Sequence, residues 1–395
     1  MSRLRVQWSF LYSEPHFKDI HNVVVENPVN SDSTRMGNVD THYPATFGQS
    51  IGFSVQSKDR LRKWGLGAVM YLPLDRLALI DSGESFVPEY TLHRGSTHKP
   101  EFEVAFSGRL SSEFALGAGI HFGAKLDSNT SVFLNQGAGT SSSMRISAGL
   151  KTQASPYFGL SYVPSDTLSL GLTFRTASPQ AQTLQVQSSA RAIGTVSALD
   201  FSFPALSTLY YDPLSLELGT EWKYSSQAVI YAQVDYQAWS KFESPNITIL
   251  DPQTSTCAPN CGVKFSEGRN LSGQTRDTFI PRIGHVWKTL NGSFLTGYTY
   301  RPSIYRSLPT EAGNAIDPDE HRFSAGYGFG FDSLLVFDAP GRLNFHAAYS
   351  IYPKRSVQKT SGDESGNAAN LKVGAPGYDI GGSEWGGGLT LELAL

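Results

Sequence analysis

The fold is decided by the stretch Glu101-Phe-Glu-Val-Ala-Phe-Ser-Gly-Arg-Leu-Ser-Ser-Glu-Phe-Ala-Leu-Gly-Ala-Gly-Ile-His-Phe122. Nearly every second residue in it is apolar or aromatic, and the residues between them are small, polar or charged. Successive side chains of a β-strand point to opposite faces, so this alternation predicts two strands with one apolar face each. A tight turn is expected at Ser111-Ser112. The stretch therefore predicts an antiparallel hairpin whose charges all lie on one face.

The same two-residue period recurs toward both ends of the chain. Leu168, Leu170, Leu172 and Phe174 alternate with polar or small residues, for example, and the C-terminal run ends in the same way at Leu395. We expect about fourteen strands in a single domain over residues 1–395. Their approximate ranges are 3–12, 47–57, 63–73, 100–110, 113–125, 144–163, 166–190, 208–224, 227–243, 276–288, 292–302, 321–331, 341–352 and 383–395.

The connections between these strands alternate strictly in length. Long connections, such as 13–46, 75–99, 244–275 and 353–382, are separated by tight turns such as Pro164-Ser165. Outer-membrane barrels have long extracellular loops and short periplasmic turns. The sequence therefore predicts an all-β fold, a transmembrane antiparallel β-barrel in the outer membrane of a Gram-negative cell.

Composition supports this fold class and excludes others. Charged residues make up only 17% of the chain, below the roughly 25% of a typical soluble domain. The net charge of -3 gives no basic face for nucleic acid. No run of 18 apolar residues exists to form a membrane-spanning helix, so a membrane span requires a closed sheet. A soluble propeller is the alternative, but the chain shows no repeat of 40 to 50 residues.

The first residues, Met1 to Tyr12, alternate like a strand and contain no apolar secretory signal. We interpret them as the first barrel strand. The hypothesis that follows is that Met1 is an internal or wrongly chosen start and that a signal peptide lies upstream.

Several phrases, in order, resemble the FadL-like family of outer-membrane transporters. They are Ser50-Ile-Gly-Phe-Ser-Val55, Trp64-Gly-Leu-Gly-Ala-Val-Met-Tyr-Leu-Pro73, Phe158-Gly-Leu-Ser-Tyr-Val-Pro164, Leu170-Gly-Leu-Thr-Phe-Arg-Thr176, Pro213-Leu-Ser-Leu-Glu-Leu-Gly219, Asp235-Tyr-Gln-Ala-Trp-Ser240, Pro281-Arg-Ile-Gly284, Gly297-Tyr-Thr-Tyr300 and His321-Arg-Phe-Ser-Ala-Gly-Tyr-Gly328. The resemblance implies a fourteen-strand barrel that takes up long-chain fatty acids or aromatic hydrocarbons passively. It further implies a mostly apolar lumen and lateral release into the membrane. The N-terminal hatch of that family has no counterpart here.

Ionisable residues on the expected inner face are the candidate ligand-binding residues, since arginine in particular suits a fatty acid carboxylate. The alternative is a solvated or mutually paired lumen lining. Tyr231 and Trp239 share the expected face of Asp235, and they are expected either to form part of an apolar binding wall or to pack the interior. The full set of candidates is Arg109, His121, Arg175, Tyr231, Asp235, Trp239, Arg282, Arg322 and His346.

The cysteines, an acidic cluster, a G-x-S-x-G match and several aromatic residues are all expected to have structural rather than catalytic or metal-binding roles. Cys257 and Cys261 are expected to form a disulfide in a long polar loop. The acidic cluster at 317–320 is expected to be solvated or bridged to lipopolysaccharide rather than to form a metal site. Gly48-Gln-Ser-Ile-Gly52 matches a nucleophile elbow but lacks its turn and helix. Aromatic residues near strand ends, expected in interfacial girdles, are Trp64, Tyr71, Trp222, Tyr224 and Tyr300.

The sequence thus predicts a channel for hydrophobic molecules with no cofactor, no metal and no catalytic residues. Its expected partners are outer-membrane lipid, lipopolysaccharide and a hydrophobic small molecule, and it is expected to be a monomer. A general diffusion porin for small polar solutes is the alternative, with opposing rows of charge in its lumen.

Overall fold

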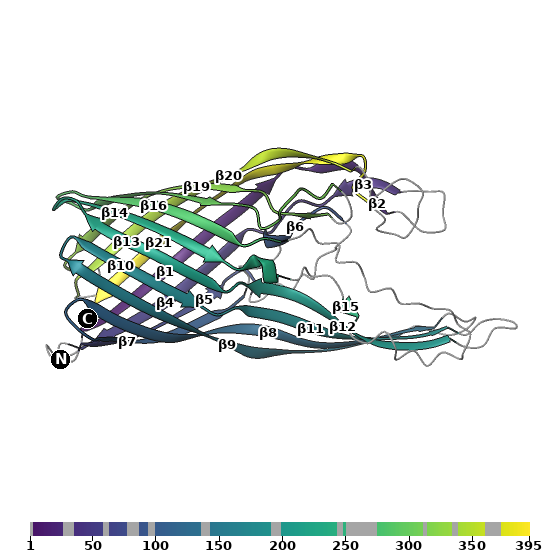
Figure 1. The fold of residues 1–395 in the computed structure, drawn as a ribbon, viewed down its shortest axis with the longest axis horizontal. Coiled ribbons are helices and arrows are strands. Elements are labelled where there is room, and N and C mark those ends of the chain that lie inside the picture. The colour runs from purple at the N-terminus through teal and green to yellow at the C-terminus, as the bar shows by residue number, and fades with distance from the viewer. Residues whose placement is uncertain are drawn as a thin grey trace, which may run out of the picture.

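The chain forms a closed antiparallel β-barrel of 14 strands in a computed structural model (Figure 1). The structure describes residues 3–26, 35–57, 63–76, 87–93, 99–135, 143–190, 199–242, 248–249, 275–310, 314–333, 339–359 and 373–395. Strand β1 (Arg3–Phe17) pairs with the last strand, β21 (Gly377–Ala394), with Trp8 opposite Leu391. This pairing closes the wall, and the predicted fold class is confirmed.

The remaining wall strands follow one another around the barrel in chain order. Strands β10 and β11 together fill one position in the wall, because the strand is interrupted at 176–177 and then continues in the same direction. Strands β12 and β13 fill another position in the same way. The bounds are β4 (Thr46–Gln56), β5 (Trp64–Pro73), β7 (Glu101–Arg109), β8 (Phe114–Asn135), β9 (Ser143–Ser165), β10 (Leu168–Arg175), β11 (Ser178–Ala190), β12 (Leu199–Asp212), β13 (Ser215–Lys223), β14 (Ala228–Gln237), β16 (Thr278–Lys288), β17 (Ser293–Arg301), β19 (Glu320–Phe331) and β20 (Gly341–Gln358).

Several predicted strand ends are wrong. The predicted strand 166–190 is two strands, and 208–224 is also divided, at Pro213-Leu214, where proline has no N–H to donate to a ladder. The predicted strand 227–243 ends at Gln237, and a short 3-10 helix, η2 (Trp239–Lys241), follows it. A two-residue strand, β15 (Thr248–Ile249), lies in a predicted loop.

The two faces of the wall differ as the alternation predicted. The outward face carries large apolar side chains with roughly half of their surface exposed, for example Phe106 and Leu218, both at 57%. The inward face carries glycine, serine and ionisable residues. So much exposed apolar surface on every strand suits hydrocarbon rather than water. Among the described residues, no helix is long and apolar enough to cross a bilayer.

Two hairpins continue well beyond the wall on the long-loop side. They are formed by β8 with β9 and by β11 with β12, and Figure 1 shows them running out together at the lower right. There β11 leaves β9 and pairs with β8 in parallel, with Gln185 opposite Ser131. This parallel contact was not predicted.

The buried apolar core lies at the extracellular end of the barrel, in a structure that we call the cap. Its elements are β2 (Ile20–Glu26), β3 (Arg35–Val39), β6 (Glu89–Tyr90), η1 (Thr91–His93), η2, β18 (Ala315–Ile316) and the outer ends of β20 and β21. Strands β6 and β18 pair in parallel. The main cluster of fully or nearly fully buried side chains is Ile20, Val23, Tyr90, Ile316, Val357, Tyr378 and Ile380. The loops therefore do not leave the mouth of the barrel empty.

Candidate functional site

On the inner wall, aromatic rings lie against glycines of the neighbouring strand and so leave the lumen open. A Cβ atom at Gly48 would come within 2.5 Å of the ring of Tyr71 on the neighbouring strand, and one at Gly388 would come within 2.5 Å of the His346 ring. Any larger residue at these two positions would therefore push the ring into the lumen. Both glycines occupy inward positions of their strands, which is why a residue without a side chain is found there.

A cavity of about 550 Å³ lies beneath the cap in the extracellular half of the lumen. One part of its lining is apolar or aromatic, with Leu11 and Tyr71 from the wall and Leu92 from η1. The other part is ionisable. The lining residues are Leu11, Tyr12, Ser13, Pro15, Pro44, Thr46, Tyr71, Leu92, His93, Lys99, Glu101, Arg301, Glu320, Arg322, His346, Tyr352, Glu384 and Gly387. The cavity can therefore accept an apolar body with a polar end.

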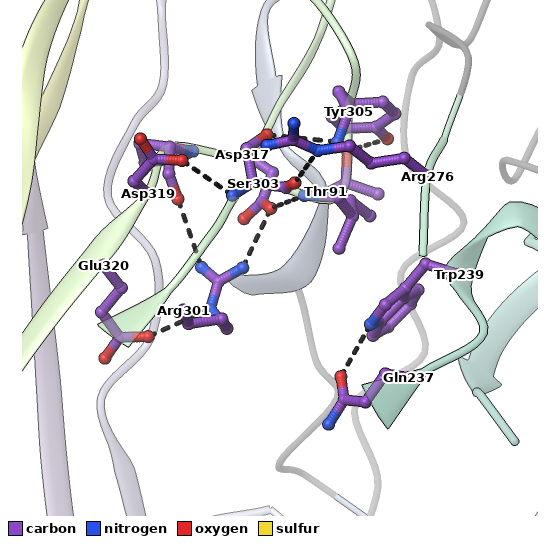
Figure 2. Close-up of polar contacts among 12 residues, drawn as sticks. Thr91, Gln237, Trp239, Arg276, Arg301, Ser303, Tyr305, Asp317, Asp319 and Glu320 are labelled. Atoms are coloured by element: carbon purple, nitrogen blue, oxygen red, sulfur yellow. Dashed lines mark hydrogen bonds and ion pairs between the residues drawn. The ribbon is translucent and has the colours of Figure 1, made fainter. Parts of the chain in front are cut away.

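Arg301 is the centre of a buried ion-pair network that joins the wall to the cap (Figure 2). Its Nη1 lies 2.9 Å from Asp317 Oδ2 and its Nε lies 3.1 Å from Glu320 Oε2. Asp317 Oδ2 also accepts the N–H of Ile304 at 2.7 Å, and Ser303 donates its N–H to Asp319 at 2.8 Å. The expectation that the acidic cluster at 317–320 is solvated is therefore wrong, since arginines bind it.

Glu384 forms a second polar centre at the cavity. Tyr352 donates its hydroxyl to Glu384 Oε2 at 2.8 Å, and Ser13 donates to Oε1. His93 of the cap stands 4.0 Å from the same carboxylate and packs among the rings of Phe17, Tyr43 and Tyr352. Burial lowers the pKa of His93, so its ring is neutral at pH 7 despite the nearby carboxylates.

Arg322 faces the same cavity but forms no ion pair within the described part of the chain. It lies on β19, opposite Ser350 on one side and Thr299 on the other. The other cationic side chains of the cavity already have acidic partners. Lys99 binds Asp212 at 2.7 Å and Glu101 at 3.2 Å, and Arg301 is paired as described above. Together with His346, Arg322 therefore presents unused donors to the cavity.

A smaller cavity of about 260 Å³ contains two further candidates, His121 and Arg175. Arg175 binds Glu103 at 2.9 Å and approaches Glu217 at 3.7 Å, with its guanidinium over the Tyr157 ring. His121 lies 3.8 Å from Glu101. These side chains therefore pair mainly with one another, which agrees with the alternative of a mutually paired lumen lining.

The remaining candidates are dispersed. Asp235, almost completely buried, binds Arg282 at 2.7 Å on the neighbouring strand. Arg109 lies at the short-turn end of β7, and Tyr231 faces the lower lumen. Trp239 does not share the face of Asp235, because the strand ends before it.

Trp239 lies in η2 instead, where it packs against Phe242, Ile304 and Tyr305 in the cap. Its Nε1 donates to Gln237 Oε1 at 2.7 Å (Figure 2). It is a packing residue of the cap and not part of the lumen wall. Cys257 and Cys261 lie outside the described residues.

Sequence reasoning missed several cavity residues. Tyr71 was expected in an interfacial girdle, but its position on β5 is inward and it lines the cavity. Glu384 and Tyr352 also occupy inward positions, so alternation was a sufficient signal for them. His93 comes from a loop segment without periodicity, and nothing in the sequence indicated it. Within the described residues, no group of three His, Cys, Asp or Glu side chains could hold a metal ion.

The lower lumen has a lining of mixed polarity. A cavity of about 370 Å³ there is lined by polar or charged residues such as Arg5, Gln7, Glu103 and Glu392 and also by apolar ones such as Val6, Phe53 and Val69. The mostly apolar lumen that the family resemblance implied is interrupted in this part of the barrel by the charged side chains of Arg5, Glu103 and Glu392. The upper cavity, at about 550 Å³, is the larger of the two and is the candidate site for an apolar molecule.

Comparison with solved structures agrees with this architecture. A FadL homologue of Pseudomonas aeruginosa is 12% identical over 100% of this chain and 89% of its own, with a TM-score of 0.53. The toluene transporter TodX of P. putida is 13% identical over 100% of this chain and 90% of its own, with a TM-score of 0.52. No protein-family model and no curated protein matches the sequence. At such low identity the likeness shows the fold, and the chain has a FadL-like barrel fold.

Proposed function

We propose that this protein is an outer-membrane channel for the passive uptake of hydrophobic molecules. The observation that carries the proposal is the upper cavity, which joins an apolar wall to unused donors beneath an ordered cap, inside a barrel with a lipid-facing belt. The solved structures with the same fold include a toluene transporter, which supports the same solute class.

Lateral release fits the polarity of the lumen better than release into the periplasm. An apolar solute leaving the upper cavity downward would pass the charged side chains of Arg5, Glu103 and Glu392 and then enter the aqueous periplasm. That costs roughly 0.8 kcal/mol for each CH₂ group returned to water. Exit through the wall into hydrocarbon avoids this cost.

Arg322 and His346 are the proposed anchoring residues for a polar end of the solute. Both line the upper cavity, and Arg322 has no ion pair within the described part of the chain. A guanidinium binds a carboxylate through two parallel hydrogen bonds. The apolar part of the solute then lies against Leu11 and Tyr71.

The test uses a charge placed on the apolar side of the cavity. We expect Leu11→Glu to reduce the uptake of radiolabelled long-chain fatty acid or toluene at least tenfold in cells that lack other such channels. Gln7→Glu is the matched control, since it lies on the same face of β1 but outside the upper cavity, and its uptake should remain unchanged. Equal uptake by both variants would contradict the role of this cavity.

The charged residues of the lower lumen, Arg5, Glu103 and Glu392, favour one second candidate, a diffusion channel for small polar solutes. Liposome swelling separates the two. A channel for hydrophobic molecules should admit arabinose or glucose slowly while the cap is closed. Rapid swelling in sugars, together with no uptake of apolar solutes, would favour the diffusion channel.

A further inference from the structure

Three arginines from separate segments surround a pocket in the extracellular part of the molecule, outside the upper cavity. The pocket measures about 240 Å³. Arg276 precedes β16, Arg306 follows β17, and Arg355 lies in the outer part of β20. Arg276 can be followed in Figure 2 beside Ser303 and Tyr305.

The backbone fixes Arg276 and Arg306 next to each other. Thr275 and Tyr305 form an antiparallel bridge, and Arg276 donates its N–H to the carbonyl of Ile304 at 2.7 Å. In this register Arg276 stands opposite Ile304, with Arg306 two residues further along the same segment. Such diagonal neighbours have Cα atoms about 7 to 8 Å apart. Two guanidinium groups at that separation can reach the same tetrahedral anion.

The charges of these two arginines are not compensated. Arg276 uses its Nε to donate to the Ser303 carbonyl at 3.0 Å, and neither Arg276 nor Arg306 has an ion pair within the described residues. The two carboxylates that line the pocket bind neither Arg276 nor Arg306. Asp317 is held by Arg301, and Asp319 by Arg355 and the Ser303 N–H. The pocket therefore has an excess of positive charge.

The pocket lies where the lipid-facing wall ends. Tyr300 is one of its lining residues and sits on the outward face of β17, where its ring contacts His321. Aromatic residues on that face mark the boundary between hydrocarbon and headgroups. A pocket bordered by such a residue and by arginines opens at the height of lipid headgroups.

We infer that this pocket binds a phosphomonoester carried on a glycolipid of the outer leaflet. Paired guanidinium groups bind phosphate through parallel charge-assisted hydrogen bonds, and basic pockets at headgroup level select anionic lipids. The site is separate from the upper cavity. It stands whether or not the barrel transports hydrophobic solutes.

The experiment measures binding of diphosphorylated lipid A to the full chain in detergent, by native mass spectrometry. The expected result is at least tenfold tighter binding than for lipid A from which the phosphates have been removed. R276Q/R306Q should abolish this difference. R109Q is the matched control, because Arg109 is an exposed arginine at the opposite end of the barrel, and it should bind like the unaltered protein.

Two further measurements keep the result interpretable. R306Q alone should weaken binding several-fold, and it removes an exposed side chain that has no hydrogen bond to any residue the structure describes, so its folding should be unaffected. Inorganic phosphate at millimolar concentration should not displace the lipid. Equal binding of phosphorylated and dephosphorylated lipid A, or full displacement by inorganic phosphate, would overturn the inference. Neither outcome bears on uptake, which is measured separately.

Discussion

Arg301 Nη1 lies 2.9 Å from Asp317 Oδ2, and this ion pair fastens the segment that carries β18 to wall strand β17. The Asp317 side chain is completely buried, and Arg301 is 16% exposed. Breaking such a pair by removing one partner typically costs 3 to 5 kcal/mol, since a charge is left buried and unpaired. The cap is therefore held to the barrel by a contact that a single substitution can break.

We expect D317N to loosen the cap while the barrel remains folded. The Ile304 N–H, which donates to Asp317 Oδ2, should exchange with solvent at least tenfold faster in hydrogen exchange measurements. Asp332 is exposed, lies in the turn after β19, and forms no ion pair among the described residues, so D332N is the control. Unchanged exchange at Ile304 in D317N would contradict the fastening role of this pair.

A reversible cross-link can test whether the cap has to move for transport. Glu89 and Ala315 are paired in the parallel bridge between β6 and β18, which brings their Cα atoms within the range of a disulfide. In a background with Cys257 and Cys261 replaced by serine, E89C/A315C should lose most of its solute uptake when oxidised. Reduction should restore it. Full uptake in the oxidised protein would show that solutes pass the cap without separating these strands.

The closed cap should weaken in acid because of His93. Burial lowers the pKa of His93 in the folded protein, whereas the exposed ring titrates near 6.5. The opened state therefore binds more protons below pH 6.5, and stability falls with pH from about 6.5 down to the lowered pKa. Glu384, Glu320 and Asp317 favour the protonated ring and Arg301 disfavours it, but burial is the largest effect.

The measurement is channel conductance in planar bilayers between pH 7.5 and pH 5. We expect openings to become more frequent below pH 6.5. Phenylalanine suits the aromatic surroundings of His93, so H93F should flatten this part of the profile. A profile that is the same in both proteins would assign the acid response to other groups.

The lipid-facing belt predicts a difference between two arginine substitutions. Leu218→Arg places a charge on the outward face and should cost about 2 to 4 kcal/mol, the range for the bilayer midplane. Thr173→Arg lies on the adjacent strand but faces the lumen beside Glu217, and should cost much less, because it places no charge in hydrocarbon. Urea unfolding in lipid vesicles compares them. Equal losses would contradict the assignment of the two faces.

The wall could be predicted from the sequence because each strand repeats the same physical pattern. Every second side chain meets hydrocarbon, so residues such as Phe106 and Leu218 identify both the strand and its outward face. The same pattern would also have placed Tyr71 and Glu384 in the lumen. Tyr71 was misassigned because an aromatic residue near a strand end was assumed to face the interface.

The cap could not be predicted, because its contacts join segments that have no periodicity. Tyr90 both donates its hydroxyl to the Gly381 carbonyl and accepts the Gly381 N–H, and these residues lie almost three hundred positions apart in the chain. The pocket formed by Arg276, Arg306 and Arg355 depends on three such segments. Their sequences give no indication that they meet.

The pairing of β1 with β21 has a consequence for how the molecule is assembled. A partly built sheet has two unpaired edges, whose N–H and C=O groups find no water inside a bilayer. Trp8 meets Leu391 only after every intervening strand has taken its place. Insertion should therefore be nearly all-or-none, and the cell has to keep the whole polypeptide unfolded and soluble until that seam forms.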